Sequence, residues 1–434
     1  MARRTALVLL ALAAAASAAD LELPVKEETL DNGLKVLVLE DHDIPNVALY
    51  VVWRVGSRNE VPGITGLAHF FEHTMFTGGA KYGKSFDPTM EAAGGSNNAY
   101  TSRDITVYQD WFPSSQLDLI LDMEADRMRG MLFDPKVVSS ERGVVASERR
   151  LSMERPPRVM EEQLWAAAYT AHPYQWDVLG WMIDIQNWKK RDLETFFDHN
   201  YAPNNATVVV VGDVEPKRVF ELVHEKMGAL PRKPERRPIH TQEPEQKGER
   251  RVVVRDPNAS IARVMAAWHI VATHDPDFAV FEVLESVLLI GESSRLHRLL
   301  VEEKGACLSV SGGWQGYQFD PSLFVIDCEM RGGVPTARAE ELVYGALQAL
   351  QKKGPEKREL EKAKNQLKAS ILRRLKTING KADLIADTET FFGGWRRLPE
   401  RLKRIEAVTP KDVRRVMAKS FRQTNRTVCT LVLK

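Results

Sequence analysis

Residues 185–211 read IQNWKKRDLETFFDHNYAPNNATVVVV, and residues 405–431 read IEAVTPKDVRRVMAKSFRQTNRTVCTL. Both copies show apolar residues at helical spacing, then a short polar turn, then a β-branched run, which indicates a helix, a turn and a strand. Internal repeats of this kind point to a duplicated unit. The ungapped matches are Ile185 with Ile405, Asp192 with Asp412, Asn205 with Asn425, Thr207 with Thr427 and Val208 with Val428.

The rest of the chain divides around this repeat. Strand-like runs that precede helical segments open both halves, at residues 47–57 and 262–272. Residues 231–250 are rich in proline and charge, lack periodicity and are typical of a linker. We predict an α+β fold of two homologous, α/β-roll-type domains, each a mixed sheet packed with helices. The expected limits are 20–230 for the first domain and 251–434 for the second.

Composition restricts the class of protein. With 434 residues the chain is too long for one ordinary core. Hydrophobic residues make up 44% and charged residues 27%, as in globular proteins. A formal net charge of +1 gives no sign of electrostatic binding to nucleic acid.

Residues 1–19 have the pattern of a secretory signal peptide. Two arginines precede an apolar run over residues 6–16, and small residues suit cleavage after Ala18 or Ala19. An uncleaved membrane anchor is the alternative, although the run is short for a bilayer. No later stretch is long and apolar enough to cross a membrane, so we predict an exported protein.

Cys307, Cys328 and Cys429 are the three cysteines, and an odd number leaves at least one thiol free. Cys307 and Cys328 are expected on neighbouring strands, where a disulfide is conceivable. The chain is not a disulfide scaffold, so its core must supply most of the stability.

The segment GLAHFFEHTMFTGG, from Gly66, places His69, Glu72 and His73 on one helix face. Two imidazoles one turn apart can bind a single zinc ion, and a carboxylate beside them can take a proton from water. A solvated helix face, or core histidines with satisfied hydrogen bonds, would give the same pattern. The apolar neighbours favour a buried helix, where three polar groups without partners would cost several kcal/mol.

A catalytic zinc needs a third protein ligand. Glu141 and Glu148 lie two helical turns apart in SSERGVVASERRL and share a face. By spacing alone they fit a solvated face equally well, with salt bridges to Arg142 and Arg149.

These motifs together resemble the pitrilysin/insulinase superfamily, the M16 metallopeptidases, which includes mitochondrial processing peptidases and short bacterial members. The resemblance rests on the inverted His-x-x-Glu-His motif and the distal glutamate Glu148, and it covers almost the whole mature chain. Further similar segments are GGSNNAYTSRDITVY (94–108), HPYQWDVLG (172–180), NYAPNNATVVVVGDV (200–214) and SSRLHRLLVEEKG (293–305).

The resemblance implies a zinc endopeptidase with one zinc ion per chain. His69, His73 and Glu148 would bind the metal, Glu72 would be the general base, and Glu141 would orient a ligand. Peptides or unfolded polypeptides would be the substrates, enclosed between two bowl-like halves. For a short bacterial member with a signal peptide, the expected location is the periplasm.

In the family, the strand after the Gly-Gly pair offers its edge to the substrate. This implies loose, backbone-directed binding at Asn98, Ala99 and Tyr100. An ordinary turn is the alternative for Gly94 and Gly95.

The chain departs from the family in its second half. Many active members have an Arg and a Tyr seven positions apart, which hold the substrate and its reacting carbonyl. Aligning residues 299–310 places Val301 and Leu308 there, and neither side chain can donate a hydrogen bond. A shifted alignment could use Arg298 or Tyr317, but these two lie much too far apart in the sequence to match that spacing.

We therefore predict a heterodimer, or an assembly of such pairs, with a homologous zinc-less subunit that supplies the Arg and Tyr. A homodimer, or a weak enzyme with a divergent second half, is the alternative. Two other functions stay open: a catalytically inactive binding or structural subunit, and a zinc hydrolase or zinc-binding module without peptidase activity.

Overall fold

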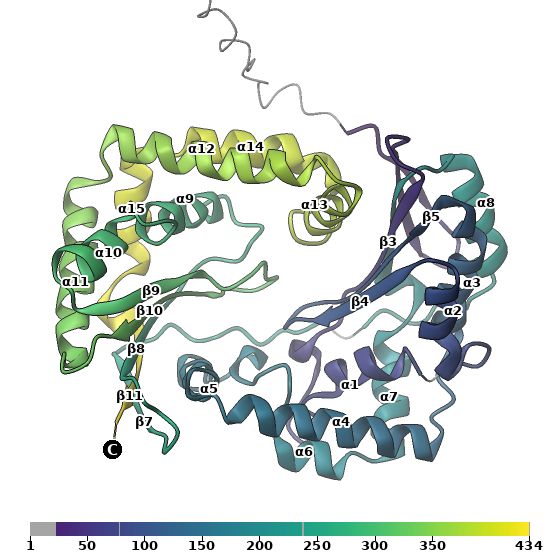
Figure 1. The fold of residues 1–434 in the computed structure, drawn as a ribbon, viewed down its shortest axis with the longest axis horizontal. Helices are drawn as coiled ribbons and strands as arrows, with labels where there is room; N and C mark the ends of the chain where they lie inside the picture. The colour runs from purple at the N-terminus through teal and green to yellow at the C-terminus, as the bar shows by residue number, and fades with distance from the viewer. Residues whose placement is uncertain (1–22, 78, 237, 434) are drawn as a thin grey trace, which may run out of the picture.

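A computed structural model describes residues 23–77, 79–236 and 238–433 of the chain (Figure 1). The predicted signal peptide lies outside these residues. The described part holds two sheets, one in each half, as the repeat predicts. Among the described residues, no helix combines the length and the apolar character that crossing a membrane requires.

The first sheet has the strand order β1-β2-β6-β3-β5-β4. It is mixed, because β2 and β6 run parallel while the other neighbours are antiparallel. Its strands are β1 (Lys26–Thr29), β2 (Lys35–Glu40), β3 (Asn46–Trp53), β4 (Ser96–Thr101), β5 (Thr106–Pro113) and β6 (Ala206–Gly212). The helices of this half are α1 (Leu67–Thr74), α2 (Phe86–Ala92), α3 (Leu117–Arg129), α4 (Pro135–Met153), α5 (Pro156–Ala168), α6 (Met182–Asn187), α7 (Lys190–Asn200) and α8 (Pro216–Met227).

The second sheet repeats this topology without a counterpart of β1 among the described residues, in the order β7-β11-β8-β10-β9. Its strands are β7 (Arg250–Arg255), β8 (Arg263–His269), β9 (Cys307–Trp314), β10 (Leu323–Met330) and β11 (Arg426–Val432). The helices are α9 (Phe278–Leu288), α10 (Arg295–His297), η7 (Arg298–Glu303, a π-helix), α11 (Thr336–Lys353), α12 (Lys357–Arg374), α13 (Ile378–Phe391), α14 (Leu398–Ala407) and α15 (Pro410–Ser420).

The predicted repeat is confirmed. Helix α7 and strand β6 of the first copy correspond to α15 and β11 of the second, at the positions that the ungapped match pairs. The same asparagine closes the turn in both copies. Asn205 Nδ2 donates to the carbonyl of Asn200 at 2.7 Å, and Asn425 Nδ2 donates to the carbonyl of Ser420 at 2.7 Å. The shared polar turn therefore fixes how each helix passes into its strand.

One helix from each half packs on the sheet of the other half. The apolar side chains of α13 join a cluster with Leu37, Tyr50 and Val209 of the first sheet. In the same way α5 joins a cluster with Met265, Val325 and Leu431 of the second sheet. Figure 1 shows α13 beside β3 and α5 below β8. The two halves are thus interlocked, since separating them would expose apolar surface on both sheets.

Between Met227 and Arg250, the described residues contain no helix or strand. This agrees with an irregular connection there, and we keep 20–230 and 251–434 as proposed domain limits. Cys307 and Cys328 lie on the neighbouring strands β9 and β10 as expected, and all three cysteines are buried free thiols.

Candidate metal centre

Helix α1 carries the predicted cluster, and its start is fixed by a buried carboxylate. Glu60 accepts the backbone N–H groups of Gly66 and Ala68, each at 2.8 Å. Gly66 has φ 88°, a left-handed conformation that favours glycine. Burial raises the pKa of Glu60, although the two amide hydrogen bonds act against this. The helix buries Leu67 and Phe71 among its apolar residues and turns its polar face the other way.

Three potential metal ligands converge on that polar face. His69 Nε2 lies 3.2 Å from His73 Nε2, and Glu148 Oε2 lies 3.4 Å from the first nitrogen and 3.5 Å from the second. A tetrahedral zinc ion with ligands at ~2.0–2.2 Å keeps its donor atoms about 3.2–3.6 Å apart. Among the described residues this is the one group of three His, Cys, Asp or Glu side chains with this arrangement. The donor set and its spacing therefore fit zinc.

The protonation of His69 suits a ligand. Burial, and then the neighbouring His73, lower the pKa of His69 to about 4. Its imidazole is therefore neutral at physiological pH, with a lone pair available for a metal. Its Nδ1 atom is buried and has no hydrogen-bond partner among the described residues.

Glu141 and Glu148 project from the same side of α4, as their spacing predicts. Glu141 Oε2 lies 3.7 Å from Nδ1 of His73, the ring nitrogen opposite the ligand atom. The salt bridges of the alternative, with Arg142 and Arg149, are not found among the described residues. Arg149 is buried and bonds Glu162, and Arg142 donates to the carbonyl of Trp188. Glu148 is exposed, as on a solvated face, and the nitrogen atoms near both glutamates are those of the histidines.

Glu72 is held by a residue that the sequence analysis did not single out. Its Oε2 accepts a hydrogen bond from Thr101 Oγ1 at 2.6 Å. Burial raises the pKa of Glu72, and this hydrogen bond partly offsets the effect. Thr101 is the last residue of β4, so the strand and the carboxylate are directly coupled. Glu60 is the second residue that was missed, because a loop glutamate a few positions before a glycine is not a recognised capping signal.

Strand β4 lies at the edge of its sheet and pairs with β5 alone among the described residues. Its side chains alternate in exposure, so Asn98 and Tyr100 point to the exposed side while Ala99 lies half-buried on the other. The free edge is available for another strand, and the role of these residues in substrate binding stays a prediction.

In the second half, Arg298 and Tyr317, the two residues of the shifted alignment, are engaged in other contacts. Tyr317 accepts a hydrogen bond from Arg401, and Arg298 pairs with Glu303 at 3.2 Å on the π-helix η7. Leu308 lies on β9 and is 46% exposed. The structure therefore does not bring Arg298 and Tyr317 together as an Arg–Tyr pair.

Two repeated α+β halves, with a His–His–Glu cluster in the first copy alone among the described residues, define a class of zinc-peptidase-like proteins. The chain belongs to the M16 peptidase family. Residues 35–180 match the family model for insulinase (peptidase family M16), and residues 187–367 match the model for the M16 inactive domain.

Individual relatives agree with this assignment. The zinc protease PqqE of Helicobacter pylori is 34% identical over 390 residues, covering 88% of this chain and 87% of that protein. The mitochondrial-processing peptidase subunit beta of Lentinula edodes is 26% identical over 416 residues, covering 90% and 86%. A crystal structure of a protease from Helicobacter pylori has a TM-score of 0.90 at 30% identity, covering 95% and 100%. The periplasmic protease PqqL of Escherichia coli shares the fold, with a TM-score of 0.79 at 19% identity over 95% of this chain and 48% of that one.

Loss of the Glu60 carboxylate should destabilise the start of helix α1. Replacing it with Ala leaves two buried N–H groups at the start of α1 without acceptors, which we expect to cost about 2 kcal/mol or more. Glu60→Gln keeps an acceptor oxygen and should cost less. Urea unfolding gives the free energies, and hydrogen exchange should speed up at the amides of Gly66 and Ala68. Glu91→Ala, at an exposed position on α2, is the control. Unchanged exchange at both amides in Glu60→Ala would contradict the assigned cap.

Proposed function

We propose that the chain is a zinc-dependent endopeptidase that hydrolyses peptides or unfolded polypeptides. The observation that carries this proposal is the convergence of three ligand atoms within about one zinc coordination sphere, beside a separate carboxylate held at a strand edge. The relatives named zinc proteases support it. Since the second half matches an inactive-domain model, the proposed activity rests on the first half.

In this proposal His69, His73 and Glu148 hold one zinc ion, and Glu141 orients the ring of His73. When bound, zinc supplies Lewis-acid chemistry, lowering the pKa of water and polarising a carbonyl group. A carboxylate close to a coordinating histidine also raises the affinity of the site for metal.

Glu72 supplies the proton transfers. It takes a proton from the attacking water and returns it to the nitrogen of the leaving amine, which is general base and then general acid catalysis. Its burial suits this work, because a raised pKa brings a carboxylate closer to the pH of operation. The hydroxyl of Thr101 fixes one carboxylate oxygen and so leaves the other oriented for the reaction.

The edge of β4 positions the peptide. An extended substrate can add to this edge by backbone hydrogen bonds, as in other cases of strand addition. Such pairing reads the shape of the backbone more than its side chains, so specificity at Asn98, Ala99 and Tyr100 is loose. A folded protein cannot offer a free strand without local unfolding, which favours peptides and unfolded chains.

We further propose export to the periplasm after removal of residues 1–19. The signal-like sequence supports this, together with a structural neighbour described as a periplasmic protease. We also propose a homologous, zinc-less partner subunit, because Val301 and Leu308 cannot supply hydrogen bonds to a reacting carbonyl. An inactive binding or structural subunit is the competing function, and zinc content and peptide cleavage decide between them.

Zinc binding should depend on the three proposed ligand residues. The purified chain should contain one zinc ion by elemental mass spectrometry, and His69→Ala, His73→Ala and Glu148→Gln should each lose it. Glu141→Gln should weaken zinc binding by about 10–100-fold without abolishing it. His42→Ala, at an exposed histidine outside the cluster, is the matched control. A full complement of zinc in the three ligand variants would refute the assigned site.

The catalytic prediction separates binding of metal from turnover. Glu72→Gln should keep its zinc and its fold while cleavage of a fluorogenic peptide falls by about 10²–10⁴-fold. Thr101→Val should lose less, since it removes only the hydrogen bond that orients Glu72. Wild-type rates in Glu72→Gln would show that this mechanism is wrong.

The proposed partner subunit should be recoverable from the native source of the protein. Affinity purification of the chain with Glu72→Gln should recover a homologue that lacks His-x-x-Glu-His and carries an Arg and a Tyr seven positions apart. Adding this homologue should raise kcat/KM of the wild-type chain by about 10²–10³-fold, the usual effect of an oxyanion donor. A homogeneous chain with full activity, unaltered by any co-expressed homologue, would exclude the heteromer.

A further inference from the structure

The two sheets can be matched residue by residue through their hydrogen-bonded registers. Trp53 of β3 lies opposite Ala206 of β6, and Trp268 of β8 lies opposite Arg426 of β11. Ala206 and Arg426 are equivalent in the internal repeat. The two tryptophans therefore occupy the same place in the two copies, and they fix the alignment of the remaining strands.

The same registers identify a counterpart of the catalytic glutamate. In the first sheet, the residue paired with Trp53 on β5 is itself paired with Thr101 on β4. In the second sheet, the residue paired with Trp268 on β10 is itself paired with Trp314 on β9. Thr101 bonds Glu72. In the second half Glu285 of α9 contacts Trp314, and burial raises the pKa of Glu285 to about 7. Glu285 thus stands where Glu72 stands in the first half.

Counterparts of the other site residues follow from spacing and contact. Ser286 Oγ donates to Gln366 Oε1 at 2.9 Å, joining α9 to α12 as the contact of His73 with Glu148 joins α1 to α4. Glu359 precedes Gln366 by two helical turns, the spacing that separates Glu141 from Glu148. The equivalent positions are Glu282 for His69, Glu285 for Glu72, Ser286 for His73, Glu359 for Glu141 and Gln366 for Glu148.

This second set has lost its metal-binding character. Glu282 is buried and paired with Arg401 at 2.6 Å, so it is not free to bind an ion. Ser286 and Gln366 are neutral and satisfy each other. Glu359 is bonded by two guanidinium nitrogens of Arg295. A hydrogen-bonded and ion-paired cluster has replaced the three converging ligands.

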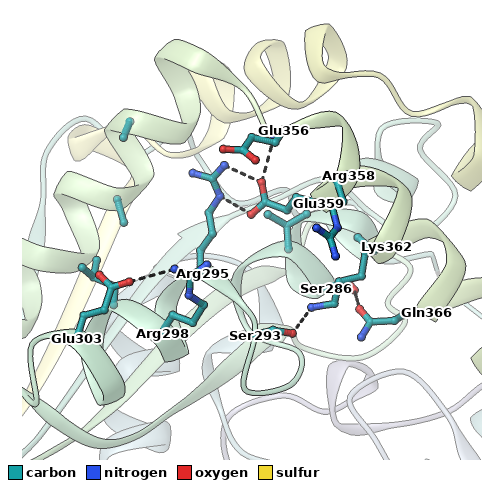
Figure 2. A pocket seen from close by; sticks show the side chains of 15 residues that line it. Ser286, Ser293, Arg295, Arg298, Glu303, Glu356, Arg358, Glu359, Lys362 and Gln366 are labelled. Atoms are coloured by element: carbon teal, nitrogen blue, oxygen red, sulfur yellow. Dashed lines mark hydrogen bonds and ion pairs between the residues drawn. The ribbon is translucent and has the colours of Figure 1, made fainter.

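A cavity of about 770 Å³ remains at this place, between α9, α10, η7, α11 and α12 (Figure 2). Its size is within the range of small-molecule sites. Two of its cations are neutralised, because Arg295 is bonded to Glu359 and Arg298 to Glu303.

The other two cations, Arg358 and Lys362, make no ion pair among the described residues, and one further carboxylate, that of Glu356, lines the same cavity. The one contact found for Lys362 Nζ among the described residues is the hydroxyl of Ser293, and no acidic partner is found there for Arg358. Arg358 and Lys362 lie one turn apart on α12 at the rim of the cavity, and Figure 2 shows both side chains beside it. Arg358 lies in the first turn of the 18-residue helix α12, where the helix dipole adds to the positive potential.

The same helix face differs in character between the two copies. By the spacing that matches Gln366 to Glu148, Lys362 corresponds to Val144, an apolar side chain that is 43% exposed one turn before Glu148. In the first half this face therefore carries Val144 between the carboxylates of Glu141 and Glu148, whereas in the second half it carries the cations Arg358 and Lys362. A ligand with anionic groups such as carboxylates would match these cations.

We propose that this cavity of the second half is a non-catalytic binding site for an acidic peptide segment, whose carboxylates pair with Arg358 and Lys362. The site goes beyond the proposed peptidase function and does not depend on cleavage. Such a site would let the second half bind polypeptide chains at the positions that are equivalent to the metal cluster of the first half.

The test measures binding directly. The chain carrying Glu72→Gln, which cannot consume the probe, is titrated into a fluorescein-labelled hexaglutamate peptide and followed by fluorescence anisotropy. We expect saturable binding that weakens with added salt, because exposed charge pairs are screened. Arg358→Ala/Lys362→Ala in the same background should reduce the affinity about tenfold or more.

A matched control removes two other helix cations, with the variant Lys352→Ala/Lys353→Ala at exposed positions on α11, and should leave the affinity unchanged. Circular dichroism checks that both variants fold. The proposal is overturned if hexaglutamate does not bind, if a hexaglutamine probe binds equally well, or if both double variants behave alike. Zinc content and cleavage by the wild-type chain are measured separately, so failure here leaves the peptidase proposal intact, and the reverse holds too.

Discussion

The structure depends on the reciprocal packing of α5 and α13, since each helix covers the sheet of the other half. Each sheet is thereby buried on two faces, which explains why the central strand β6 is buried along its whole length. Polar contacts fix the same arrangement. Lys35 of β2 pairs with Glu389 of α13 at 2.6 Å, and Tyr169 beyond α5 donates to the carbonyl of Pro321 at 2.9 Å. Because both cores need the partner half, the orientation of the first site relative to the second cavity is set by folding.

The sequence predicted the repeated elements and the ligand cluster because both are local. A helix, a turn and a strand are encoded by spacing and by turn residues such as Asn205, and His69 and His73 share a face wherever the helix lies. The packing of α5 and α13 on the sheets of the opposite halves could not be predicted from such local patterns. The burial of α13 on nearly all sides signals an interior helix but does not say which sheet it covers. Thr101 was missed for the same reason, since its role comes from a contact between a strand and a helix, whereas Glu60 was missed because its local contacts do not follow a recognised capping pattern.

The two matched copies share the backbone geometry of the proposed metal site but differ in its side chains. Strand registers, helix positions and the glutamate of α9 are kept in the second half, so the backbone still brings the same positions together. The side chains differ at the three positions equivalent to the proposed ligands. There Glu282 is bonded to Arg401, and Ser286 donates to Gln366. In the first half the ligand atoms face one another at 3.2–3.5 Å, and Nδ1 of His69 has no partner among the described residues. A cation or a proton between the members would stabilise donor atoms that lie this close.

The proposed active site lacks one group that stabilises a reacting carbonyl. In the proposed function Glu72 and the three ligand residues supply a base and a metal position, and the edge of β4 supplies backbone pairing. None of these groups places a hydrogen-bond donor where charge develops on a reacting carbonyl, a term often worth ~2.7–4 kcal/mol. The second half, locked in place by α5 and α13, holds Arg298 and Tyr317 in ion pairs and hydrogen bonds of its own. In the proposed heteromer the donor comes from a separate subunit, so the packing of α5 and α13 and the contacts of Arg298 and Tyr317 stay unchanged.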